Sequence, residues 1–160
     1  MIGLIALTTS IYASMHLQGA GSVAGPVTAE VVEVIDGDTI AVRAHIWPGH
    51  YVETRVRLEG VDTPETRRPD CDAERAAGHE ATAFTRAWLA AHPDIRLHNV
   101  RLGSFAGRVI SDLRAPVNAG AEPVRLSDAL LAADLAVPYG EDGPWCRSAP
   151  VSGPGQSRPR

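Results

Sequence analysis

Residues 27–58 decide the fold, because three β-type segments and two turns follow one another there. They read Val-Thr-Ala-Glu-Val-Val-Glu-Val (27–34), Asp-Gly-Asp (36–38), Thr-Ile-Ala-Val-Arg-Ala (39–44), Trp-Pro-Gly-His (47–50) and Tyr-Val-Glu-Thr-Arg-Val-Arg-Leu (51–58). β-Branched residues are frequent in the longer segments, and apolar and polar positions alternate in the last of them. These features predict three strands, and the Pro-Gly turn predicts a hairpin between the second and the third.

The segments that follow add helices and two more strands. Apolar residues recur near the 3.6-residue period over 73–91, which predicts a helix that Pro93 ends. Further strands are predicted over 95–102 and 107–113, and a second amphipathic helix over 126–135. Short strands with a helix inserted between the third and the fourth predict an α+β, mainly β fold: a five-stranded OB-fold barrel with packed helices. The pattern alone favours a generic α+β sandwich equally.

The 160 residues fit one domain with appendages at both ends. The chain begins with an apolar run, and no charged residue precedes Glu30. Such a run is typical of a signal peptide or an N-terminal membrane anchor, and a buried N-terminal helix is the alternative. We therefore expect a leader or anchor over 1–24, a domain over 25–140 and a flexible tail over 141–160. The domain would then be exported: periplasmic, secreted, or anchored on the outer side of a membrane.

The chain is acidic, with a formal net charge of -4 and a pI near 5.8. Proteins that bind nucleic acid tightly and without sequence preference are usually basic. Any phosphate chemistry must therefore rest on a few local arginines and a metal ion, since no broad basic surface is available.

Cys71 and Cys146 are the only cysteines of the sequence. In an exported chain they can form one disulfide between the loop before the first predicted helix and the C-terminal tail. Two separate thiols, or a link between two chains, are the alternatives.

Two acidic motifs stand where predicted strands begin and end. Asp36-Gly37-Asp38-Thr39 is a turn between two strands, and Asp62-Thr63-Pro64-Glu65 follows the third strand. Neighbouring antiparallel strands of a barrel can bring these two places together. Several oxygens with few nitrogens suit a hard cation such as calcium. Alone, Asp-Gly-Asp is more often a solvated turn than a metal site, and an Asx turn or a helix cap is the alternative for Asp-Thr-Pro-Glu.

Taken together and in order, the motifs resemble the staphylococcal nuclease (thermonuclease) family. The resemblance covers residues 27–139 and rests on five stretches: Val-Ile-Asp-Gly-Asp-Thr (34–39), Val-Arg-Leu-Glu-Gly-Val-Asp-Thr-Pro-Glu (56–65), Gly-His-Glu-Ala-Thr-Ala-Phe-Thr (78–85), Phe-Ala-Gly-Arg-Val (105–109) and Leu-Leu-Ala-Ala-Asp-Leu-Ala-Val-Pro-Tyr (130–139).

The resemblance implies an OB-fold nuclease, a hydrolase that cuts DNA and RNA with calcium and leaves 3′-phosphates. It implies that Asp38 and Asp62 are carboxylate ligands of calcium, that Thr63 adds its backbone carbonyl, and that Asp36 lies near the metal. It also implies that Glu65 is the general base and that Arg57 and Arg108 bind the scissile phosphate. We also expect a monomer that prefers single-stranded substrates. The N-terminus would supply any membrane attachment.

The chain departs from the family pattern in two places. Phe105 stands where the family commonly has tyrosine, and one extra residue precedes Gly107-Arg108. The loop after Glu65 is rich in arginine and contains Cys71. Two other functions remain open: a catalytically weak OB-fold module that binds single-stranded nucleic acid or a protein partner, and a structural domain that binds calcium for stability. A module that only binds has no need of Glu65.

Overall fold

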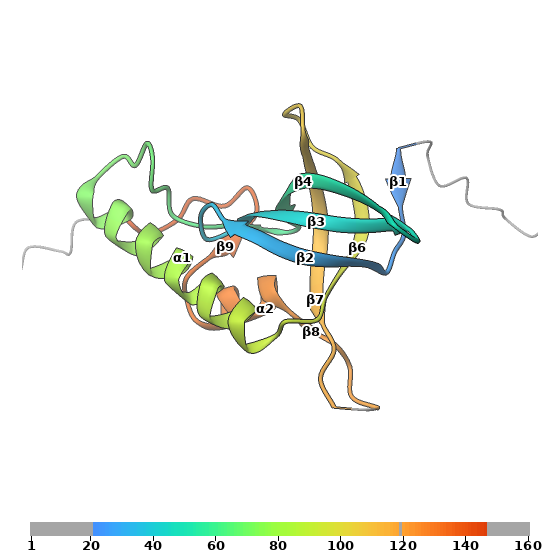
Figure 1. Ribbon diagram of the computed structural model, residues 1–160. Helices are drawn as coiled ribbons and strands as arrows, with labels where there is room; N and C mark the ends of the chain where they lie inside the picture. The colour runs from blue at the N-terminus through green and yellow to red at the C-terminus, as the bar shows by residue number, and fades with distance from the viewer. Residues whose placement is uncertain (1–20, 119, 147–160) are drawn as a thin grey trace, which may run out of the picture.

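A closed five-stranded barrel forms the centre of the computed structural model, which describes residues 21–118 and 120–146 (Figure 1). The strands pair in the order β6-β2-β3-β4-β7, and β6 closes the barrel on β7. Their bounds are β2 Val27–Val34, β3 Thr39–Trp47, β4 His50–Leu58, β6 Ile95–Leu102 and β7 Arg108–Ala115. All of these pairs are antiparallel except β4 with β7, which is parallel.

Alternation along the strands determines what the barrel encloses. In the β3–β4 pair, Ile40 lies opposite Val56, and both side chains are fully buried. Because successive side chains of a strand point to opposite faces, the neighbours Arg55 and Arg57 lie on the outer face. The core extends from the barrel to Leu126 and Leu130 of the second helix.

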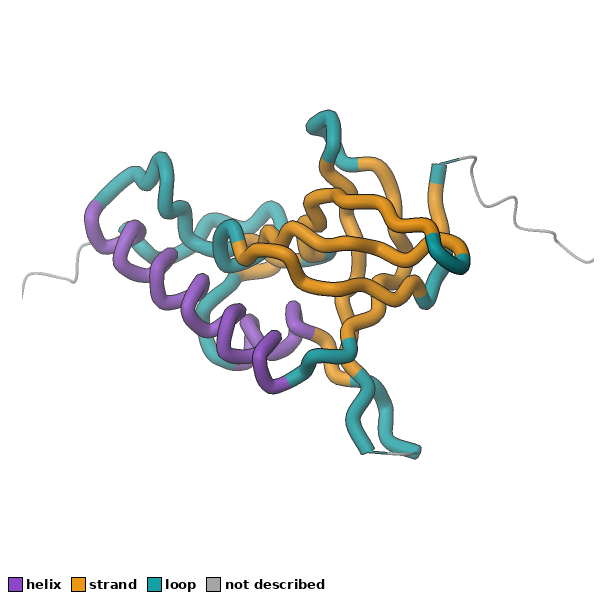
Figure 2. The backbone as a smooth tube through the Cα atoms, viewed as in Figure 1, coloured by secondary structure: helices purple, strands orange, loops and turns teal. Residues whose placement is uncertain are grey.

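Two helices and four short strands complete the described chain. Helix α1 spans Asp72–Ala91 and helix α2 spans Leu126–Ala132; the short strands are β1 Ser22–Val23, β5 Val61–Asp62, β8 Val124–Arg125 and β9 Val137–Pro138. Both helices lie on the same side of the barrel (Figure 2). Strand β5 pairs with β9, which brings the chain after β4 next to the segment after α2. No helix among the described residues is long and apolar enough to cross a membrane.

The predicted α+β, mainly β barrel of OB-fold type is confirmed, and closure of the sheet excludes the open sandwich. The second helix is shorter than the predicted 126–135. It ends at Ala132 because Asp134 takes a left-handed backbone conformation, with φ 57°, and the Leu135 amide donates back to the Leu130 carbonyl at 3.0 Å.

The predicted leader and tail overlap only in part with the described residues. Residues 1–20 and 147–160 lie outside them. Ser22 and Val23, at the end of the predicted leader, pair with Arg101 and Val100 of β6. Residues 141–146, at the start of the predicted tail, lead to a disulfide.

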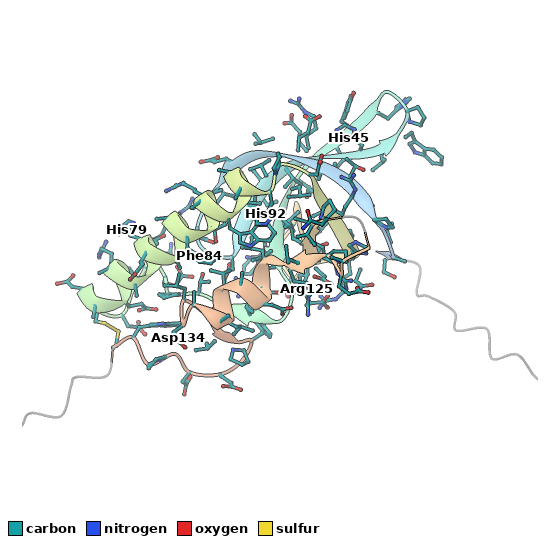
Figure 3. The ribbon with its side chains drawn as sticks, turned by 90° about the horizontal axis from the view of Figure 1, so that it is seen from below. His45, His79, Phe84, His92, Arg125 and Asp134 are labelled. Carbon is teal, nitrogen blue, oxygen red and sulfur yellow. A yellow bond between two sulfur atoms is a disulfide. The ribbon has the colours of Figure 1, made fainter. Side chains whose placement is uncertain are left out.

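This disulfide joins Cys71 to Cys146, the intramolecular alternative of the sequence analysis (Figure 3). Cys71 is also the N-cap of α1, and its sulfur accepts a hydrogen bond from the Glu74 amide at 3.3 Å. The bond therefore fixes the end of the described chain to the start of the long helix.

A buried carboxylate connects the barrel to α2. Asp112 of β7 is 3% exposed and accepts hydrogen bonds from Arg114 Nε at 2.7 Å and Arg125 Nε at 2.9 Å. Arg125 lies at the start of α2 (Figure 3). Burial raises the pKa of Asp112, but the two guanidinium groups lower it by more, so its pKa lies below the ordinary value.

We expect Asp112→Asn to lower the free energy of unfolding by about 1–3 kcal/mol at pH 7, because both arginines lose an ionic acceptor. A carboxylate whose pKa is lower in the folded than in the unfolded protein stabilises the folded state at pH values above its unfolded pKa of about 4. That stabilisation is lost as the pH falls through the pKa of the folded state. Urea unfolding at pH 7 and pH 3 measures the difference in the free energy of unfolding between wild type and variant. This difference should be smaller at pH 3. The control is Asp128→Asn, an exposed partner of the same arginine. A difference that is equal at both pH values would contradict an electrostatic role for Asp112.

Candidate functional site

Arg57 brings the two acidic motifs together. It lies near the end of β4, opposite Thr39 at the start of β3, so its side chain leaves the sheet beside Asp38. Its guanidinium donates one hydrogen bond to Asp38 Oδ1 and another to Asp62 Oδ1. A third goes to the Val61 carbonyl at 3.3 Å. Two carboxylates that are 24 residues apart in the chain therefore share one cation.

Asp38 is the fixed member of this group. Its side chain is 4% exposed, whereas that of Asp62 is 41% exposed. Asp38 Oδ2 accepts hydrogen bonds from the Thr63 amide at 3.0 Å and the Thr63 hydroxyl at 3.1 Å, and Oδ1 accepts one from the Thr39 hydroxyl at 3.0 Å. These bonds compensate the burial of a charge and set the orientation of the carboxylate.

A face of small residues on α1 holds both acidic segments in place. Its members are spaced as one helical stripe and are all buried: Gly78, Ala81, Thr82 and Thr85. The Thr85 hydroxyl donates to the Gly37 carbonyl at 2.6 Å. A Cβ on Gly37 would lie 2.8 Å from Thr63 Oγ1 and 2.9 Å from Ala81 Cβ, so only glycine allows this approach. The stretch 78–85 therefore serves to position the site.

Glu65 lies in the loop between β5 and α1, which Glu74 of α1 holds. The buried Glu74 carboxylate accepts hydrogen bonds from the Glu65 amide at 3.3 Å and the Asp70 amide at 2.6 Å. Glu65 itself is exposed, and among the described residues its carboxylate has no hydrogen bond or ion pair. The loop backbone is thus anchored while the Glu65 side chain stays accessible to water.

Asp36 lies on the other side of the Asp-Gly-Asp turn and accepts a hydrogen bond from the Asp38 amide at 3.2 Å. Burial and, second, the negative charge of Asp38 raise the pKa of Asp36 to about 6. Asp36 therefore gains a proton as pH falls through about 6.

Arg108, at the start of β7, faces the same region as Arg57. Both arginines line one cleft of about 190 Å³ together with Tyr139. The Tyr139 ring centroid is 5.8 Å from Cζ of Arg57, and the Phe105 ring centroid is 4.6 Å from Cζ of Arg108. The Nε atom of Arg108 is buried and has no hydrogen-bond partner. Phe105 thus contacts the Arg108 guanidinium with its ring face.

The ligand atoms that the site offers, carboxylate and carbonyl oxygens, are of the type that calcium binds. Asp38 and Asp62 already share one cation, the guanidinium of Arg57, so both carboxylates can reach a single positive charge. Oxygen donors of this type are the ligands that calcium takes, and water would have to complete its six to eight positions. Within residues 21–118 and 120–146, no three His, Cys, Asp or Glu side chains are grouped to hold a metal ion. A metal here would therefore depend on the two carboxylates and the Thr63 carbonyl.

No protein-family model matches the chain, and no curated protein matches it. Its function must therefore be inferred from the residues of the site.

The structure brings most of the predicted site residues together, by contact or by a shared cleft. Asp38, Arg57, Asp62 and Thr63 are joined by hydrogen bonds, whereas the Glu65 side chain forms no hydrogen bond or ion pair with any of them in the described part of the chain. Sequence analysis assigned no role to Glu74, Thr39 or Arg55. The available signal for Glu74 was an acidic residue in the first turn of a helix that begins shortly after the acidic motif.

We expect Gly78→Ala to lower the free energy of unfolding by about 1–3 kcal/mol. In an unobstructed helix the same change would stabilise by about 1 kcal/mol. Here the added Cβ would lie 2.7 Å from the Pro64 carbonyl oxygen and 2.8 Å from Thr66 Cγ2, so the loop must move. Urea unfolding measures the change. The control is Ala76→Gly at an exposed position of the same helix, which measures the effect of helix propensity alone. A Gly78→Ala variant that is more stable than wild type would show that α1 does not support the loop.

Proposed function

We propose that the chain is a calcium-dependent phosphodiesterase that hydrolyses DNA and RNA and leaves 3′-phosphates. One observation carries the proposal: the guanidinium of Arg57 contacts both Asp38 and Asp62. Two carboxylates and a phosphate-binding type of side chain thus meet at one place, beside an accessible glutamate. Asp38, Asp62 and the Thr63 carbonyl would hold the calcium ion.

Calcium, when bound, supplies positive charge that neutralises the phosphodiester and its transition state. Arg57 would then be released from the carboxylates and could fork onto two phosphate oxygens. Arg108 lines the same cleft and would bind the phosphate from its other side. An arginine keeps its charge at any working pH, so both contacts persist throughout the reaction.

Glu65 would act as the general base. It lies two residues after Thr63, its backbone is held by Glu74, and its carboxylate is exposed to water. It would take a proton from the attacking water as the water oxygen bonds to phosphorus. The bond from phosphorus to the 5′ oxygen breaks, the leaving oxygen takes up a proton from solvent, and the phosphate stays on the 3′ side.

A binding module without catalysis is the second candidate, and one observation favours it. Arg57 already pairs with both carboxylates, as in an ion-pair network that only stabilises a barrel. Such a module would hold single-stranded nucleic acid or a protein partner on the same face.

We also propose that the domain acts outside the cytoplasm. The Cys71–Cys146 disulfide supports this location, because such bonds persist in oxidising compartments. The apolar N-terminal run would serve as leader or anchor, and the protein would be a monomer.

The deciding experiment is digestion of single-stranded DNA by the full chain, with calcium and with excess chelator. We expect degradation with calcium only, and a loss of at least about 100-fold in turnover for Glu65→Gln, because that change removes the base and keeps the size of the side chain. Glu80→Gln, an exposed position on α1, is the control. Digestion that survives in chelator, or in Glu65→Gln, would overturn the proposal, and binding without digestion would favour the second candidate.

A separate prediction concerns the place of the metal. Arg57→Gln should lower the melting temperature in chelator, because Asp38 keeps its buried charge and loses its cation. Calcium should then raise the melting temperature of the variant by more than it raises that of wild type, since no guanidinium competes for the two carboxylates. Differential scanning calorimetry with and without calcium measures both changes. An equal or smaller calcium effect in the variant would place the ion elsewhere.

A further inference from the structure

Two arginines stand side by side on the barrel with no acidic partner among the described residues. Arg55 of β4 and Arg108 of β7 are register partners in the parallel pair, and the Arg55 amide donates to the Gly107 carbonyl at 3.5 Å. Within the described residues, neither side chain has a salt bridge, whereas Arg43, Arg57, Arg101, Arg114 and Arg125 each pair with an acid. Like charges on neighbouring strands are destabilising. A local conflict of this kind is expected where a ligand supplies the missing charge.

The two arginines line a hollow of about 260 Å³. Arg67, from the arginine-rich loop after Glu65, lines it too, and Phe105 and Ala106 form one wall. Asp36 is the only carboxylate among its lining residues, so three guanidinium groups face one acid. The unpartnered, buried Nε of Arg108 belongs to a side chain that borders both this hollow and the cleft that contains Arg57.

We propose that this hollow, defined by Arg55, Arg67, Arg108 and Phe105, binds a second phosphate of a polynucleotide strand, next to the one that is cut. The inference takes its class of ligand, a polynucleotide, from the proposed function. It requires that the protein binds this ligand but not that it cuts it. Guanidinium groups exclude a metal cation and favour the planar, two-oxygen contact that a phosphate offers. The Phe105 ring can stack on a base beside it, which requires no particular sequence.

The strand geometry places the two phosphate positions in line. Arg55 and Arg57 project from the same face of β4 two residues apart, about 7 Å along the strand. Arg108, the register partner of Arg55, borders both the hollow and the cleft. A single strand could therefore run across β4 and β7 with successive phosphates on Arg57 and Arg55. The chain has a net charge of -4, but this local row of arginines can still attract a nucleic-acid strand. The attraction needs to act only along the bound strand.

Binding is tested on the full chain in excess chelator, where the probe stays intact. Fluorescence anisotropy with a labelled twelve-residue oligothymidylate is measured across a range of salt concentrations. We expect Arg55→Gln to weaken binding roughly 3- to 10-fold and to reduce the salt slope by about 0.7, the value for one phosphate contact on a single strand. The control is Arg43→Gln, whose charge is already paired with Glu53 at 2.9 Å, so its affinity and slope should equal those of wild type.

A second arm separates this site from the cutting site. Thymidylyl-thymidine has one phosphodiester, so its calcium-dependent cleavage should be the same in Arg55→Gln and wild type, while cleavage of the oligothymidylate at subsaturating concentration falls. The melting temperature of Arg55→Gln should be unchanged or higher, because the like-charge pair is removed. Arg67→Gln, in an exposed loop, should repeat the binding effect if Arg55→Gln folds poorly.

The outcomes for the two proposals differ. If Arg55→Gln and Arg67→Gln bind the oligothymidylate as Arg43→Gln does, the phosphate site is refuted, whether or not the wild type digests DNA. If the wild type digests nothing but its binding depends on Arg55, the phosphate site stands and the hydrolytic function fails. Equal losses of cleavage on the one-phosphate and the long substrate would place Arg55 at the scissile phosphate and overturn the inference.

Discussion

The bridge from Arg57 to Asp38 and Asp62 is the interaction on which the rest of the site depends. A carboxylate that is 3% exposed, as Asp38 is, requires a cation or several hydrogen bonds, and it has both. The same bridge holds the end of β4 next to the turn before β3 and next to β5. A metal ion held by Asp38 and Asp62 would have to displace this guanidinium, and metal binding would then be coupled to the position of the side chain that we propose binds phosphate.

The long helix has a role that its composition does not suggest. Apolar side chains such as Phe84 and Trp88 only partly face the core, and the buried stripe consists of small and hydroxyl-bearing residues. Small residues allow the backbone of the two acidic segments to approach closely, and Thr85 and Glu74 add hydrogen bonds to them. The disulfide at the start of α1 completes this support. The two acidic segments are thereby held against a rigid element.

Charge is distributed locally rather than over the whole surface. The chain is acidic overall, yet unpaired arginines gather where β4, β7 and the loop after Glu65 meet, and acids pair with most other arginines in the described barrel. An anionic ligand would therefore be attracted to this group of arginines, and its affinity should depend strongly on salt.

The sequence by itself determined the five barrel strands, the first helix and which residues belong to the candidate site, because these follow from local periodicity and from short motifs. Periodicity left the barrel and the sandwich equally open, and the pairing of β6 with β7 decided between them. The length of α2, the burial of Glu74 and the pairing of the two cysteines needed the tertiary structure. So did the contact of Arg55 with the β7 segment, since the parallel pairing of β4 and β7 joins residues that are 53 positions apart. Local patterns state which face of a strand a residue occupies, but only closure of the barrel decides which residue stands beside it.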